Sequence, residues 1–129
     1  MKSDNANRKG HDAKLYNGVT LLSDKLKAWV KSQEAIIWQG HKKERGDASH
    51  LLAYTAKLGE EVGELAEQVL ARFGYQRKSK ELAQGADELA DECADVIIVS
   101  LFLAEAAGVD IEKALKRKME KLEKRNQES

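Results

Sequence analysis

The chain has 129 residues, in which 22 Lys and Arg balance 22 Asp and Glu, and it contains no proline. This length fits one domain, and the balanced charge gives no electrostatic reason to expect a nucleic-acid polymer or an anionic membrane as a partner. The low aromatic content of 5% and the abundance of Ala, Leu, Glu and Lys favour helices.

Cysteine content and apolar runs bear on the cellular compartment. The single cysteine, Cys93, cannot form an internal disulfide, so nothing requires an oxidising compartment. Residues 1–10 contain no apolar run of the kind that marks a secretory signal. The longest apolar run, residues 96–104, is far shorter than the ~18 residues that span a bilayer. We therefore expect a cytoplasmic protein with no membrane partner.

The chain begins with a polar segment and then shows helical periodicity. Residues 1–14 are polar and unpatterned, which indicates a flexible tail in front of a single domain over 15–129. Apolar residues then recur at helical spacing, which predicts a first helix over 15–39. Gly18 weakens its first turn, so the helix can start as late as Thr20.

Three further helices are predicted, over residues 49–73, 81–107 and 111–125. Gly74 and Gly108 stand where glycines end helices, and Asp110 stands where an aspartate caps the start of one. Four helices with short connections predict an all-α fold of the four-helix-bundle type.

Carboxylates gather on one face of the second helix and on one face of the third. Residues three or four apart share a helix face, so Glu61 lies with Glu64, and Glu88 lies with Glu92 and Asp95. Like charges this close repel each other unless a cation lies between them. The pattern predicts a site for a hard divalent metal, and Mg²⁺ fits because it prefers oxygen ligands, with Mn²⁺ as a substitute.

The third helix indicates that these acids face inward. The stripe that carries Glu92 and Asp95 continues with apolar residues that must be covered, namely Val99, Phe102 and Ala106. A single acidic face is usually just solvated, whereas two such faces, one of them on a covered stripe, favour the metal site. Residues 96–104 are apolar on every side, which is typical of a helix that is central to its fold or covered by a second subunit. We therefore predict a homo-oligomer.

The paired acidic motif resembles that of the MazG family of all-α nucleoside triphosphate pyrophosphohydrolases. The family pattern is EExxE followed by ExxD, which stands here as Glu60-Glu61-Val62-Gly63-Glu64 and Glu92-Cys93-Ala94-Asp95. The similarity spans roughly residues 20–125. The resemblance implies Mg²⁺-dependent hydrolysis of a (deoxy)nucleoside triphosphate to the monophosphate and pyrophosphate. It also implies a homodimer or homotetramer in which a neighbouring subunit forms part of each site.

The resemblance further implies roles for the motif acids. By motif match, the metal ligands would be Glu61, Glu64, Glu92 and Asp95. Glu60 matches the additional acid of the motif, which binds a further metal or positions water. Either Glu60 or Glu64 would take a proton from the water that attacks the α-phosphorus.

Basic and aromatic residues supply candidates for substrate contacts. Lys57 shares the acidic face of the second helix, and Lys118 and Arg125 share a face of the last helix, so these three are candidates for binding phosphates. Trp38 and His41 are candidates for the base pocket, because aromatic rings stack on bases. An ordinary surface ion pair and ordinary core packing are the alternatives for these residues.

The preferred base and the catalytic role itself leave alternatives open. Leu122 and Val99 stand where the dCTP-preferring branch of the family has asparagine and tyrosine. That branch also has a tryptophan shortly after EExxE, where this chain has Ala71 and Arg72, so the base is left unassigned. Two other functions compete with the enzyme. One is a non-catalytic metal- or nucleotide-binding module of the same fold, and the other is a helical oligomerisation module with solvated acids.

Overall fold

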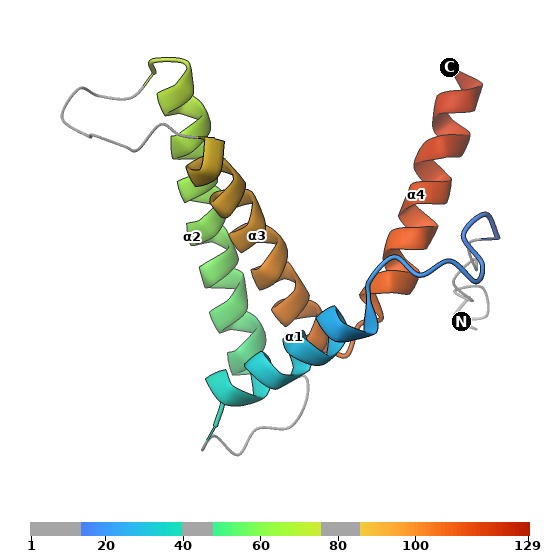
Figure 1. Ribbon diagram of the computed structural model, residues 1–129, viewed down its shortest axis with the longest axis horizontal. Helices are drawn as coiled ribbons and strands as arrows, with labels where there is room; N and C mark the ends of the chain where they lie inside the picture. The colour runs from blue at the N-terminus through green and yellow to red at the C-terminus, as the bar shows by residue number, and fades with distance from the viewer. Residues whose placement is uncertain (1–13, 40–47, 76–85) are drawn as a thin grey trace, which may run out of the picture.

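The computed structural model describes residues 14–39, 48–75 and 86–129, and these residues form helices without a strand. The helices are α1 (Asp24–Ile37), α2 (Ala48–Arg72), α3 (Ala86–Ala107) and α4 (Ile111–Glu128), as Figure 1 shows. The predicted all-α class is therefore confirmed. Among the described residues, no helix combines the length and the apolar character needed to cross a membrane. The expected tail over 1–14 lies outside the described residues, apart from Lys14.

The first helix begins later than the sequence suggested. Ser23 caps α1, since its hydroxyl accepts a hydrogen bond from the Leu26 N–H at 3.1 Å. Upstream, Gly18 adopts a left-handed backbone with φ of 76°, which a helix does not tolerate. The predicted start at residue 15, or at Thr20, is therefore wrong. Apolar residues continue at helical spacing before Ser23, but there they follow a non-helical path.

The predicted signals for helix ends at Gly74, Gly108 and Asp110 are confirmed, whereas α4 ends at Glu128 and not at the predicted residue 125. Gly74 and Gly108 take left-handed φ values of 73° and 69° just after α2 and α3. The Asp110 carboxylate accepts a hydrogen bond from the Lys113 N–H at 3.0 Å and caps α4. The predicted start of the third helix at residue 81 lies outside the described residues.

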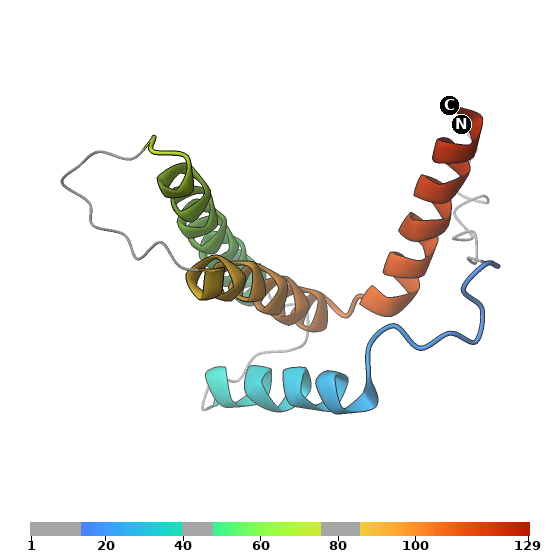
Figure 2. The ribbon, with the colours of Figure 1, turned by 45° about the horizontal axis from the view of Figure 1, so that its top comes forward.

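Helices α2 and α3 run side by side, and α1 crosses the C-terminal part of α3 (Figures 1 and 2). Each of the three helices contributes buried apolar side chains, namely Val30, Tyr54, Ala71, Val99, Leu101, Ala104 and Ala106. The Phe102 ring of α3 lies 5.9 Å from that of Trp29 on α1 and 6.0 Å from that of Tyr54 on α2. The aromatic contacts therefore tie α1 and α2 to the same part of α3.

Helix α4 stands apart from the α2–α3 pair in both views (Figures 1 and 2). Its first turn is held by Glu112, whose carboxylate accepts hydrogen bonds from the N–H groups of Leu21 (2.7 Å) and Leu22 (3.1 Å). Glu112 also pairs with Lys27 of α1. Lys27 and then the two N–H groups lower the pKa of Glu112 to about 2. Further along, the Tyr16 hydroxyl donates a hydrogen bond to Glu123.

Polar residues of α2 are more deeply buried than several of its large apolar residues. The buried residues of α2 include His50, Tyr54 and Glu61. By contrast, the apolar side chains of Val62 in α2 and of Phe73 just after it are 47% and 71% exposed. None of the described side chains is less than 2% exposed. One chain therefore buries polar residues of α2 beside its apolar core and leaves large apolar residues of the same helix exposed.

Candidate metal centre

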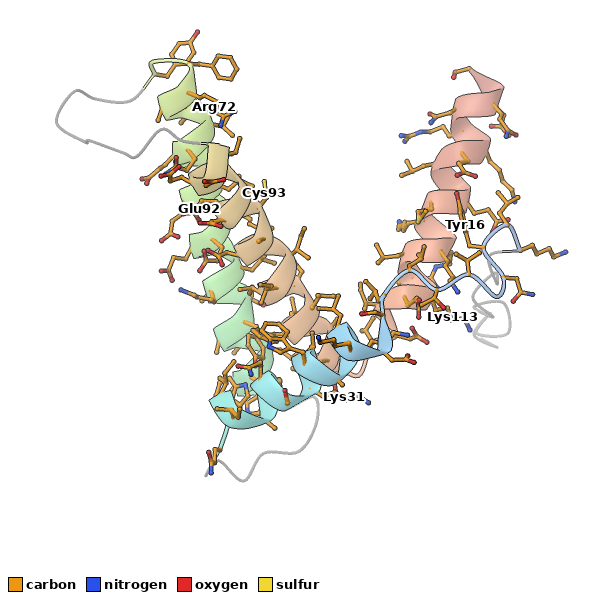
Figure 3. The ribbon with its side chains drawn as sticks, in the orientation of Figure 1. Tyr16, Lys31, Arg72, Glu92, Cys93 and Lys113 are labelled. Atoms are coloured by element: carbon orange, nitrogen blue, oxygen red, sulfur yellow. The ribbon has the colours of Figure 1, made fainter. Side chains whose placement is uncertain are left out.

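Three carboxylates from two helices converge between α2 and α3. Glu61 comes from α2, and Glu92 and Asp95 come from one turn of α3. Each offers one carboxylate oxygen, and these oxygens lie within 4.8 Å of one another. Figure 3 shows Glu92 in the region where α2 and α3 run together. We call Glu61, Glu92 and Asp95 the acidic triad.

The acidic triad has the donor set and the unsatisfied atoms that a hard cation requires. Glu61 is only 6% exposed, and its Oε2 atom is buried without a hydrogen-bond partner. Oε2 of Glu92 is buried in the same way. An unpartnered buried oxygen costs ~1–3 kcal/mol, and more when it is charged. All three donors are carboxylate oxygens, which suit Mg²⁺ and do not suit a soft metal.

Glu64, the fourth predicted ligand, lies next to the acidic triad without joining its close oxygen group. The charge of Glu61 raises the pKa of Glu64, and desolvation and the charge of Glu92 add to the increase. Of the four predicted metal ligands, the structure thus brings three together and places the fourth beside them. Glu60, the additional acid of the motif, is exposed at the side of this group.

Lys57 lies one turn before Glu61 on α2 and reaches the edge of the acidic triad. Its Nζ is 3.0 Å from Oε1 of Glu61 and 3.3 Å from Oε1 of Glu60. These two carboxylates, Glu61 first, raise the pKa of Lys57. Of the three predicted phosphate-binding residues, Lys57 is therefore in place beside the acids.

A comparison with protein families matches the part of the chain that contains the acidic triad. A model described as the MazG nucleotide pyrophosphohydrolase domain matches residues 49–129. The chain belongs to the MazG family. The matched stretch contains α2, α3 and α4 with both acidic motifs, whereas α1 lies before it.

A protein of Bacillus subtilis (strain 168) resembles this MazG chain. It is named YpjD, is described as uncharacterized, and is 35% identical over 77 residues. The aligned stretch covers 60% of this chain and 68% of YpjD. No solved structure gives a significant match. The match to the family, not to a relative of known activity, therefore identifies the chain.

The other two predicted phosphate-binding residues lie far from the acidic triad in this MazG chain. Lys118 and Arg125 are exposed on α4. Because α4 stands apart from the α2–α3 pair (Figures 1 and 2), one chain does not bring them to the triad.

An aromatic cluster joins the end of α1 to the start of α2. The rings of Trp38 and His50 stack with centroids 3.8 Å apart, and Nε1–H of Trp38 donates a 2.7 Å hydrogen bond to the Tyr54 hydroxyl. Nδ1 of His50 lies 3.7 Å from the Glu34 carboxylate. Burial is the main cause that raises the pKa of Tyr54. Trp38, one of the two base-pocket candidates, thus has one ring face against His50, and His41 lies outside the described residues.

The sequence-based site residues omitted His50 and Tyr54, although a signal for them was present. His50, Tyr54, Lys57 and Glu61 recur at intervals of four, three and four, so they share one face of α2. Polar residues at that spacing, in line with a motif acid, indicate a face turned towards the protein interior.

Proposed function

We propose that this chain is a Mg²⁺-dependent nucleoside triphosphate pyrophosphohydrolase, which converts a (deoxy)nucleoside triphosphate to the monophosphate and pyrophosphate. The observation that carries the proposal is the acidic triad with its two buried, unpartnered oxygens. Membership of the MazG family supports the reaction class.

The proposed metal ligands are Glu61, Glu92 and Asp95, with Glu64 beside them. Bound Mg²⁺, or Mn²⁺ in its place, would supply the positive charge that neutralises the triphosphate and stabilises the transition state. Water attacks the α-phosphorus, and a carboxylate takes its proton. Glu60 and Glu64 are both candidates for that proton acceptor, since both lie beside the acidic triad.

The proposed substrate contacts divide between one chain and its neighbour. Lys57 would bind phosphate beside the acidic triad, and its position next to Glu60 and Glu61 supports this role. Lys118 and Arg125 would reach a triphosphate only from a second copy, given the position of α4. The exposed apolar residues of α2 and the isolated α4 support a homodimer or homotetramer. Trp38 and His41 remain the proposed base contacts, with the base itself unassigned.

The test is a pyrophosphate-release assay with the full chain, millimolar Mg²⁺ and a panel of canonical and modified nucleoside triphosphates. We expect equimolar monophosphate and pyrophosphate from at least one nucleotide. Asp95→Asn should abolish the release without changing the helical circular dichroism. If the chain bound Mg²⁺ but hydrolysed no nucleotide of the panel, the proposed activity would be wrong. A non-catalytic binding module of the same fold would then be the better description.

A further inference from the structure

The two oxygens of Glu61 have different surroundings. Oε1 lies 3.0 Å from Nζ of Lys57, whereas Oε2 is buried without a hydrogen-bond partner. The Glu61 side chain is 8% exposed and the Lys57 side chain is 50% exposed. The carboxylate is therefore fixed in the interior, while the ammonium group stands on a flexible stem that can move into solvent.

Lys57 gives a crowded group of acids a counter-charge. Glu60 and Glu61 both lie within ion-pair distance of its Nζ, and Glu61 belongs to the acidic triad with Glu92 and Asp95. Half of the Lys57 side chain is in solvent, and an incoming cation would balance the charge of Glu61, so release of the ammonium group leaves neither charge uncompensated. A divalent cation on Glu61 would repel the lysine charge at this short distance.

We propose that Lys57 is a displaceable counter-ion of the metal centre. It holds the charge of Glu61 until a divalent cation binds, and it then leaves Glu61 and becomes available for a substrate phosphate. This inference rests on the proposed metal site, and it gives Lys57 a role in metal affinity that is separate from phosphate binding.

The sign of one measurement distinguishes this role from a structural one. A lysine that merely orients Glu61 by hydrogen bonding improves the ligand, so its removal weakens Mg²⁺ binding. A lysine that competes for Glu61 opposes the cation, so its removal strengthens Mg²⁺ binding. The two roles predict opposite changes in the same dissociation constant, and neither change requires turnover.

The chain offers a matched control on α4. Nζ of Lys124 lies 3.2 Å from Oε1 of Glu120, also four residues away in the same helix. The side-chain exposures, 55% for the lysine and 7% for the glutamate, are close to those of the first pair. Lys124→Met therefore removes the same kind of ion pair at a distance from the acidic triad.

The experiment is calorimetric titration of Mg²⁺ into the full-length chain at low ionic strength without nucleotide. We expect Lys57→Met to lower the Kd for Mg²⁺ about three- to tenfold, because one opposing charge is lost. Lys57→Gln should shift the Kd in the same direction, and Lys124→Met should stay within about twofold of the unsubstituted chain. Added salt should reduce the difference in Kd for Mg²⁺ between the Lys57 variants and the unsubstituted chain.

The outcomes separate this inference from the proposed function. An unchanged or higher Kd in both Lys57 variants, with helical content intact, overturns the counter-ion role even if the chain is an active enzyme. Tighter Mg²⁺ binding in these variants supports the role even if no nucleotide is hydrolysed. A chain that binds no Mg²⁺ at millimolar concentration overturns the metal centre and the counter-ion together.

Discussion

Two buried glutamates, Glu61 on α2 and Glu120 on α4, have the same local partner and different surroundings. They are 6% and 5% exposed, and each pairs with a lysine four residues away in its own helix. Glu61 also faces Glu92 and Asp95 and keeps a buried oxygen without a partner, whereas Glu120 belongs to no such acidic group among the described residues. A lysine paired with a buried glutamate therefore does not by itself indicate a metal, whereas the group of acids around Glu61 does.

The largest expected effect is a difference in pyrophosphate release between variants of the two glutamates. Glu61→Gln should lower pyrophosphate release by about 100-fold or more, because it removes a charged ligand from transition-state stabilisation. Glu120→Gln should leave release within a few-fold and should cost at most ~1 kcal/mol of stability, since it loses a half-exposed ion pair. Steady-state kinetics and urea denaturation measure the two effects. Equal losses of activity in both variants would contradict the distinction between the two sites.

The next effect tests whether the acidic triad binds a cation. Mg²⁺ at 100 times its Kd should stabilise the chain by about 2.7 kcal/mol, which corresponds to a Tm increase of roughly 5 °C or more. Glu92→Gln should lose most of this increase, whereas Glu120→Gln should keep it. Differential scanning calorimetry with and without Mg²⁺ provides the measurement, and a Tm independent of Mg²⁺ in the unsubstituted chain would contradict the site.

A smaller effect concerns how α4 is attached. The pKa of Glu112 is lowered to about 2, so its stabilising contribution is present above the ordinary pKa of 4.5 and is lost as the pH falls towards 2. Glu112→Gln should lower the Tm by a few degrees at neutral pH and remove this part of the acid sensitivity. Thermal denaturation between pH 7 and pH 2 measures both. The Mg²⁺-induced increase in Tm should remain, because Glu112 is not part of the acidic triad.

The smallest expected effect is the pH response of Glu64. Its pKa is raised above the ordinary 4.5, so the folded chain binds this proton more tightly than the unfolded chain does. Without divalent cations, the Glu64 contribution to the free energy of unfolding should therefore rise as the pH falls from neutral towards 4.5. Urea denaturation in EDTA measures it. Glu64→Gln should flatten this rise, and an identical pH profile in that variant would contradict the assigned repulsion.

Local rules in the sequence determined the features that depend on residues close in the chain. Gly74 and Gly108 marked helix ends because a left-handed backbone favours glycine, and Asp110 marked a cap because its carboxylate reaches the next free N–H groups. Helical spacing likewise placed Glu92 with Asp95 on one face of α3. The same spacing misplaced the start of α1, because it continues through residues that are not helical. Gly18 adopts a left-handed backbone, and the helix begins only after its cap, Ser23.

Only the tertiary structure decided which helix faces meet. It turned His50, Tyr54 and Glu61 of α2 inward and grouped Glu61 with α3, with Glu64 left beside the group. It also placed Lys118 on α4, away from the acidic triad. The physical reason is that periodicity determines which residues share a face, while the choice of the face that is buried depends on packing against helices distant in the sequence.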